Sequence, residues 1–202
     1  FWDADVAALA NGSMTPVVYS TNCLTGAFAS AEDCLAEALM KKYPGGAVGV
    51  YAATESSYSG YNDSLAAGAF FAYSDSLLFT FAQATQWGKL FMLMAYPLPN
   101  GTSEKEIWMF NNLGEPELNI WSDVPAELTV SHPGTVVIGS FPFPVSVSSS
   151  YGPVENALVC IYMDGEVYET AYTDASGHVD IAVTTPPTVV GSMEVCASKH
   201  NF

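Results

Sequence analysis

Hydrophobic residues follow two different patterns along the chain, and the change between them lies near Ser122. Before this point, short continuous apolar runs alternate with longer stretches in which apolar residues recur at helical spacing. After it, short β-prone runs are separated by turn residues. Continuous runs are typical of strands covered on both faces, and evenly spaced short runs are typical of all-β folds. We therefore expect an α/β part over residues 1–123 and a β part over residues 124–202.

The first part begins with a predicted strand–helix–strand unit. Residues 16–20 and 47–54 have the composition of buried strands, and the segment between them predicts a helix. Ser30 and Asp33 are the residues expected to cap this helix. A connection of this kind makes the two strands parallel neighbours in one sheet.

Cys23 is the candidate reactive residue of this unit. It lies in a small polar turn directly after the first strand, and the turn from Thr54 to Tyr58 follows the second. The carboxyl ends of parallel strands meet at one edge of a sheet, so these turns should form a cleft there. The alternative is that Cys23 is a buried, unreactive thiol that packs as a small hydrophobic residue. For Cys34, which lies on the apolar face of the predicted helix, we expect packing in the core.

Three further helical stretches are predicted over residues 65–73, 77–96 and 104–111. The second has the length of a membrane span, but Gln83 and Lys89 interrupt it. We therefore expect a buried helix and no membrane span.

The second part reads as an immunoglobulin-like sandwich of seven short strands. The expected strands are residues 127–131, 135–138, 144–148, 157–162, 167–173, 178–184 and 192–198. Cys160 and Cys196 fall on two of them, at a spacing that suits a disulfide across the sandwich. Such a bridge would place the protein in an oxidising compartment.

Charge and composition exclude several classes of function. The chain has 202 residues, half of them hydrophobic, and a formal net charge of −16 from 21 acidic residues, five lysines and no arginine. Nucleic acid and anionic membranes require clustered basic residues, so neither is an expected partner. Without arginine there is also no bidentate guanidinium site for a phosphate or a carboxylate substrate.

The sequence offers weaker signals for modification and for metal binding. Export would permit glycosylation at three sequons, which begin at Asn11, Asn62 and Asn100. No cluster of Cys and His suits zinc and no glycine-rich loop suits a phosphate, so no cofactor is expected. Scattered acids are usually a solvated surface, although four of them are candidate oxygen ligands of a structural calcium ion. These are Asp3, Asp5, Asp63 and Asp75.

Three segments of the first part resemble the gingipain family of cysteine peptidases. They are Asn22-Cys23-Leu24-Thr25-Gly26-Ala27-Phe28, Cys34-Leu35-Ala36-Glu37-Ala38-Leu39-Met40 and Gly46-Ala47-Val48, and Asn111-Asn112-Leu113-Gly114-Glu115-Pro116 echoes a later family segment. The resemblance implies the carboxyl-side portion of a caspase-like peptidase domain, followed by an immunoglobulin-like module. It also implies a secreted or cell-surface endopeptidase that acts on protein or peptide substrates.

By this resemblance Cys23 is the nucleophile, its own backbone N–H is one oxyanion donor, and Tyr58 is a wall of the specificity pocket. The general base of the family is a histidine upstream of the cysteine. The only histidines here are His132, His178 and His200, all in the predicted sandwich.

A missing upstream histidine leaves two hypotheses open. In the first, the chain is a piece of a longer protein whose upstream segment supplies the histidine, and this piece alone is inactive. In the second, the chain is a noncatalytic cell-surface or filament subunit that uses a peptidase-like scaffold for assembly or adhesion.

Overall fold

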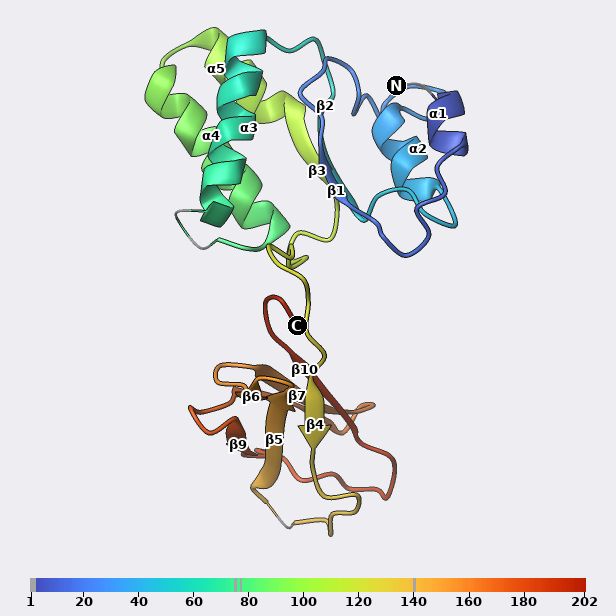
Figure 1. Ribbon diagram of the computed structural model, residues 1–202, viewed down its shortest axis with the longest axis vertical. Helices are drawn as coiled ribbons and strands as arrows, with labels where there is room; N and C mark the ends of the chain where they lie inside the picture. The colour runs from blue at the N-terminus through green and yellow to red at the C-terminus, as the bar shows by residue number, and fades with distance from the viewer. Residues whose placement is uncertain (1–2, 75, 77, 140) are drawn as a thin grey trace. The chain divides into compact units, whose positions relative to one another are not determined.

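The computed structural model describes residues 3–74, 76, 78–139 and 141–202 (Figure 1). It divides the chain into two compact units, Phe1–Ser122 and Asp123–Phe202. Each unit has its own sheets and its own hydrophobic core.

The sheet of the first unit has the strand order β1-β2-β3 among the described residues. Strand β1 (Val17–Tyr19) pairs in parallel with β2 (Gly49–Ala53), which confirms the predicted strand–helix–strand unit. Strand β3 (Phe110–Gly114) pairs with β2 in the antiparallel direction. The prediction of helix up to residue 111 was therefore wrong at its end, because Asn111 belongs to this strand.

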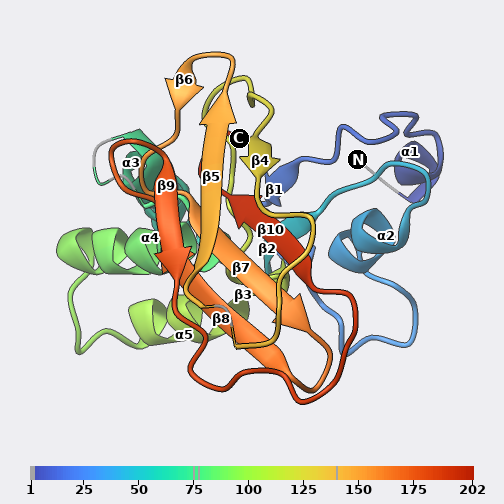
Figure 2. The same ribbon diagram turned by 90° about the horizontal axis from the view of Figure 1, so that it is seen from below.

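Helices cover both faces of this sheet (Figures 1 and 2). Helices α1 (Asp3–Ala7) and α2 (Leu35–Lys41) lie on one side. Helices α3 (Ser59–Ser74), α4 (Phe81–Ala95) and α5 (Gly101–Met109) lie on the other. Strand β2 is consequently buried at all five positions, as its continuous apolar composition predicts.

The alternation of side chains along β2 connects the two cores of this unit. Val50 and Ala52 pack in the cluster that contains Leu39 of α2. Tyr51 and Ala53 point to the opposite face, into the cluster formed with α3, α4 and α5. A single strand thus supports helices on both of its faces.

Helix α2 begins later than the sequence predicted. Its first residue is Leu35, and Cys34 occupies the N-cap position. The carboxylate of Glu37 accepts a hydrogen bond from the Cys34 N–H at 3.0 Å. Ser30 and Asp33 therefore do not cap the helix, and Asp33 instead forms an ion pair with Lys41 at 2.6 Å. Cys34 is partly buried against the α1/α2 core, which agrees with the packing role expected of it.

Helix α4 is the long apolar helix that the sequence predicted, and it packs against α3. It has 15 residues. In the part of the chain that the structure describes, no helix combines the length and the apolar character needed to cross a membrane.

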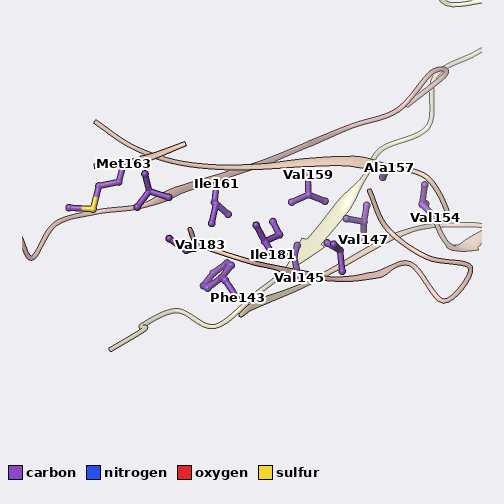
Figure 3. Packing of buried hydrophobic residues seen from close by; sticks show 12 residues of the cluster. Phe143, Val145, Val147, Val154, Ala157, Val159, Ile161, Met163, Ile181 and Val183 are labelled. Atoms are coloured by element: carbon purple, nitrogen blue, oxygen red, sulfur yellow. The ribbon is translucent and has the colours of Figure 1, made fainter. Parts of the chain in front are cut away.

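The second unit consists of two antiparallel sheets. One has the order β10-β7-β8 and the other the order β4-β5-β6, with β9 also paired to β5. Their strands are β4 (Thr129–Ser131), β5 (Phe143–Ser149), β6 (Gly152–Pro153), β7 (Leu158–Met163), β8 (Val167–Tyr172), β9 (His178–Ile181) and β10 (Glu194–Ser198). Alternate side chains of both sheets, among them Val145, Ile161 and Ile181, meet in one apolar core (Figure 3).

Two expectations for this unit were wrong. Residues 135–138 form no strand. Cys160 and Cys196 do not lie across the sandwich from each other, because β7 and β10 are neighbours in one sheet and the two cysteines are directly paired in its register. Both are free thiols in this structure.

Candidate active site

The turn that carries Cys23 is fastened to the end of β2 by backbone hydrogen bonds. The N–H groups of Leu24 and Gly26 donate to the carbonyl oxygens of Glu55 and Ala53, at 3.1 and 2.9 Å. Gly26 lies so close to β2 that an added Cβ would be 3.0 Å from the Cβ of Ala52. Only a residue without a side chain fits this approach without displacement.

Leu24, directly after Cys23, has a positive φ of 62°. This left-handed conformation is uncommon for residues other than glycine and costs free energy that the surrounding bonds must offset. It turns the chain sharply at the end of β1 and leaves Cys23 exposed. The nucleophile candidate is therefore presented at the edge of the sheet and is not buried in the core.

The loop after β2 meets Cys23 through Ser57. The Ser57 N–H donates to the Cys23 sulfur at 3.3 Å, and the Ser57 hydroxyl lies 3.6 Å from the same atom. The Cys23 sulfur is also 3.4 Å from the Ser57 carbonyl oxygen. The two turns that the sequence predicted to meet at the carboxyl edge of the sheet are thus in contact.

The two hydrogen bonds that Ser57 donates to the sulfur favour the thiolate form of Cys23. The side-chain hydrogen bond from Ser57, followed by its backbone hydrogen bond, lowers the pKa of the Cys23 thiol. Partial burial and the negative charge of Glu106 act in the opposite direction. Burial raises the pKa of the Cys34 thiol, so the two cysteines of this unit differ in chemistry as well as in exposure.

Glu106 is a fully buried acid behind the same loop. Its Oε1 accepts a hydrogen bond from the Tyr58 N–H at 2.7 Å. Among the described residues its Oε2 has no hydrogen-bond partner, and burial raises the pKa of this carboxyl group. Glu106 therefore holds Tyr58, the residue directly after Ser57.

Tyr58 borders an open cleft of about 530 Å³ between the 54–58 loop and α5. We call this the Tyr58 cleft; it is lined by Thr54, Glu55, Ser56, Tyr58, Lys105, Trp108 and Met109. Tyr58 is half exposed, at 48%. Its position is that of a cleft wall beside the cysteine loop.

A second hollow, the β1 groove, runs along the edge strand on the other side of the cysteine turn. Its volume is about 540 Å³. It is lined by Leu9, Asn11, Met14, Pro16, Val18, Tyr19, Ser20, Thr21, Asn22, Leu35, Leu39 and Gly46. Cys23 follows Asn22 directly, so an apolar groove reaches the residue next to the thiol.

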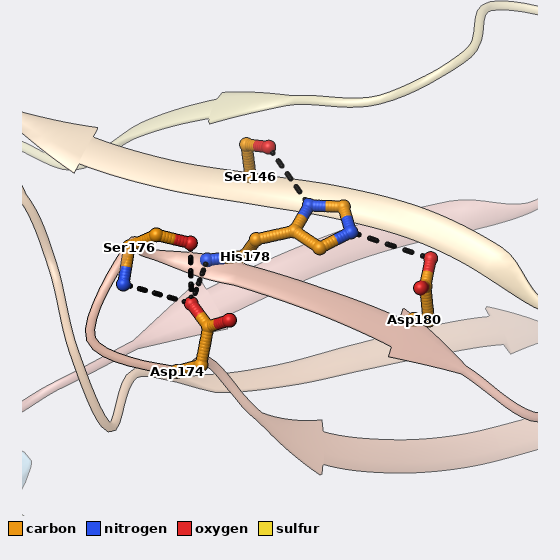
Figure 4. Close-up of polar contacts among 5 residues, drawn as sticks. All are labelled: Ser146, Asp174, Ser176, His178 and Asp180. Carbon is orange, nitrogen blue, oxygen red and sulfur yellow. Dashed lines mark hydrogen bonds and ion pairs between the residues drawn. The ribbon is translucent and has the colours of Figure 1, made fainter.

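All three histidines belong to the second unit, and the first unit has none. The ring of His178 contacts the Ser146 hydroxyl at 3.2 Å and the Asp180 carboxylate at 3.3 Å (Figure 4). His132 bonds the Pro133 carbonyl through Nδ1, and burial lowers the pKa of His200. Within its own unit, Cys23 has no histidine to act as its base.

The side-chain amides of the sequons already make structural hydrogen bonds. Asn62 is only 4% exposed and donates both amide hydrogens, to Thr21 O and to the Ser57 hydroxyl, so it was wrongly expected to be a glycan site. Asn11 likewise donates to two carbonyl groups. Asn100 caps α5 and donates to the Tyr61 hydroxyl.

Two of the four candidate calcium ligands lie among the residues whose side chains the structure describes. No group of three His, Cys, Asp or Glu side chains suited to a metal ion occurs among the described residues, which include Asp5 and Asp63. Asp75 and the side chain of Asp3 lie outside the described parts of the chain.

Comparison with known proteins identifies the family of the first unit. The sequence profile of peptidase family C25 matches residues 1–121, which include the cysteine turn, the 54–58 loop and α5. The chain belongs to peptidase family C25. Its resemblance to the gingipain-like cysteine peptidases is thereby confirmed.

Solved structures share the fold of this C25 chain over its whole length. The crystal structure of gingipain R, an Arg-specific cysteine proteinase, has a TM-score of 0.83 and 22% identity. A complex of the Porphyromonas gingivalis RgpB pro- and mature domains has a TM-score of 0.86 and 21% identity. The chain covers only 46% and 47% of these two proteins. No curated protein sequence matches it.

The residues that surround the thiol of this C25 chain were not found by sequence reasoning. Ser57 lies in a turn that was singled out, but nothing in the sequence distinguished it from Ser56. Asn62 was interpreted as part of a sequon, and Glu106 was not singled out within the helical stretch predicted over residues 104–111. Only the fold brings them to Cys23, from three segments separated along the chain.

Proposed function

We propose that this chain is the nucleophile-bearing part of an exported cysteine endopeptidase. The observation that carries the proposal is the Cys23 sulfur, exposed at the carboxyl end of β1 and contacted by the N–H and the hydroxyl of Ser57. Membership of peptidase family C25 supports the same reaction class. The caspase-like layout of the first unit and the immunoglobulin-like layout of the second are parts of this proposal.

The proposed reaction is covalent hydrolysis of a peptide bond. A histidine takes the thiol proton, and the Cys23 thiolate attacks the carbonyl carbon to form a C–S bond. Backbone N–H groups, that of Cys23 among them, stabilise the oxyanion. The C–N bond then breaks as the histidine returns its proton to the leaving amine. Water, deprotonated by the histidine, cleaves the C–S bond and regenerates the enzyme.

The histidine is proposed to come from an upstream segment of the same precursor. Strand β1 is at one edge of the described sheet, and the β1 groove beside it is largely apolar. An added strand on this edge would satisfy its backbone groups and end near Cys23. The chain spans less than half of gingipain R, so such a protein has room for this segment.

Substrate contact is proposed for the Tyr58 cleft, which accepts protein or peptide chains. Its lining combines aromatic faces with Glu55 and Lys105. Apolar walls with a few polar groups are typical of binding clefts.

The first test compares two exposed cysteines of the natively folded protein, isolated under mildly reducing conditions so that Cys196 is a free thiol. Cys23 and Cys196 are both exposed free thiols, so accessibility does not favour either of them. We expect limiting alkylation at about pH 6 to label Cys23 first, because thiolate and not thiol reacts. Peptide mass spectrometry identifies the labelled residue. In parallel, Cys23→Ala should abolish hydrolysis of a denatured protein, and Cys196→Ala should leave it unchanged.

Either of two results would overturn the peptidase. One is a Cys23→Ala protein that cleaves substrate at the wild-type rate. The other is a Cys23 thiol that reacts at acidic pH no faster than Cys196. Slow labelling together with large homogeneous assemblies would instead favour the structural-subunit function.

In an oxidising compartment, a disulfide-exchanging oxidant is proposed to accept two electrons and two protons from Cys160 and Cys196, which then form a disulfide within one sheet. The two residues face each other in the β7/β10 register, and opposed residues of antiparallel strands lie within the Cα separation of natural disulfides. We expect a mass decrease of about two hydrogens in the peptide pair from secreted material. Free thiols at both positions in such material would contradict the oxidation.

A further inference from the structure

Asn62 connects the two sides of the candidate active site. It lies in the first turn of α3, and its Nδ2 donates to the Thr21 carbonyl oxygen and to the Ser57 hydroxyl oxygen, each at 2.8 Å. Thr21 belongs to the cysteine turn and Ser57 to the loop after β2. One buried amide therefore fixes the distance between the segment that carries the thiol and the segment that contacts it.

The direction of these hydrogen bonds determines what Ser57 can do. An amide nitrogen only donates, so the Ser57 oxygen is the acceptor in its bond with Asn62. The hydroxyl hydrogen of Ser57 remains available, and the Cys23 sulfur lies 3.6 Å from this oxygen. Donation therefore runs in one direction, from Asn62 through Ser57 to the sulfur.

We propose that Ser57 and Asn62 form a hydrogen-bond relay that stabilises the Cys23 thiolate, with Asn62 acting as a positioning residue through Ser57. The inference rests on the cysteine peptidase function proposed above and adds two residues to it. When the thiol proton leaves for the base, the negative sulfur keeps two donors, the N–H and the hydroxyl of Ser57. Hydrogen bonds to a charged partner are stronger than those between neutral groups.

The electrostatic balance at the thiol agrees with this geometry. The two bonds from Ser57 lower the pKa of Cys23, with the hydroxyl as the larger cause. Titratable side chains on the surrounding segments are Glu55, Tyr58, Asp63 and Glu106. The charge of Glu106 opposes the relay by raising the thiol pKa.

The burial of Asn62 is a second, independent observation. Its side chain is 96% removed from solvent, yet its Oδ1 has no hydrogen-bond partner among the described residues. Tyr51 Oη shares this condition, and Tyr51 and Asn62 line the same small internal hollow. Unsatisfied buried polar groups reduce stability, so an apolar residue would serve the core better at position 62. The hydrogen bonds that Asn62 donates to Thr21 and Ser57 explain why an asparagine occupies this buried position.

The test is the pH dependence of Cys23 alkylation in the full-length protein, followed by peptide mass spectrometry. In Ser57→Ala we expect the rate on the acidic side of the profile to fall by about threefold to tenfold, and the profile to move to higher pH. Ser57→Thr keeps a hydroxyl and should restore the wild-type profile. Ser59→Ala, an exposed serine two residues further on, is the matched control and should change nothing.

A double-mutant cycle tests the role of Asn62. Asn62→Ala should slow Cys23 alkylation in the wild-type background and have no further effect in Ser57→Ala, because it acts through the serine. The partly buried Cys34 serves as an internal reporter of folding in the same digest. If Asn62→Ala accelerates Cys34 labelling, the first unit has loosened and this variant does not report on the relay. The comparison of Ser57→Ala with Ser57→Thr then tests the relay by itself. An unchanged Cys23 profile in Ser57→Ala overturns the relay.

The relay and the peptidase fail in different ways. A shifted alkylation profile in Ser57→Ala with full hydrolysis by Cys23→Ala would retain the relay as a property of the thiol and overturn the peptidase. Loss of hydrolysis in Cys23→Ala with an unshifted profile in Ser57→Ala would retain the peptidase and overturn the relay.

Discussion

At the level of single residues, the site contains buried polar groups that lower the stability of the folded protein. Glu106 is fully buried, and one of its carboxylate oxygens has no partner in the described structure. The other oxygen holds the Tyr58 N–H. A glutamine would keep this acceptor and remove the buried charge, so the charge itself is not needed to position the loop.

Because glutamate titrates and glutamine does not, the effect of Glu106→Gln on stability should depend on pH. Burial raises the pKa of Glu106 in the folded protein above the unfolded value of about 4.3, so wild type loses stability as the pH rises through the raised value. Glu106→Gln does not titrate, and we expect its free energy of unfolding relative to wild type to increase from pH 4 to pH 8. The gain should be on the order of 1 kcal/mol. Urea unfolding at several pH values measures it.

Glu104→Gln is the matched control for that measurement, since Glu104 is exposed on the same helix. It replaces an exposed acid and should change the free energy of unfolding little. A constant difference between Glu106→Gln and wild type across this range would show that the buried carboxyl group has an ordinary pKa.

At the scale of elements, the contact between α3 and α4 depends on glycine. A Cβ on Gly88 would lie 2.5 Å from the Leu65 carbonyl oxygen, and one on Gly68 would lie 2.5 Å from the Cβ of Phe91. Glycine within a helix lowers its intrinsic stability by about 1 kcal/mol relative to alanine. Helices α3 and α4 approach so closely that only glycine fits at Gly68 and Gly88, despite its lower helix propensity.

Gly88→Ala should therefore destabilise the first unit although it improves helix propensity. We expect the free energy of unfolding to fall by about 1–3 kcal/mol, as for other overpacked cores. Chemical denaturation followed by circular dichroism measures the change. Gly101→Ala is the control, because a Cβ there meets nothing within 4 Å. Equal stability of the two variants would contradict the tight contact between α3 and α4.

At the scale of the whole molecule, the second unit has a complete core of its own. Val145, Ile161 and Ile181 are at most 1% exposed, and the core residues come from both of its sheets. A domain with its own core is expected to fold independently. Residues 123–202 should therefore unfold cooperatively when produced alone.

Truncation of this core tests the same expectation. Ile161→Ala should lower the free energy of unfolding of the 123–202 fragment by about 2–5 kcal/mol. Val190→Ala, at a side chain that is 93% exposed, should have little effect. Non-cooperative melting of the unmutated fragment would contradict an independent unit.

The elements that the sequence predicted well are those with strong local signals. Strands β1 and β2 carry continuous apolar runs, and α4 combines helical periodicity with 15 residues of length. Prediction failed where a neighbouring element decided the outcome. Strand β3 forms because its backbone pairs with β2, and the start of α2 depends on the bond between Glu37 and the Cys34 N–H.

For the site, the sequence alone predicted that a thiol follows a parallel strand and that the next strand ends in a polar turn beside it. Hydrophobic pattern and chain connectivity are local properties, so they suffice for that inference. Which atoms contact the sulfur, in contrast, depends on how the folded segments pack together. Ser57, Asn62 and Glu106 come from a loop and two helices, and their hydrogen bonds depend on how these segments pack, which no spacing along the chain encodes.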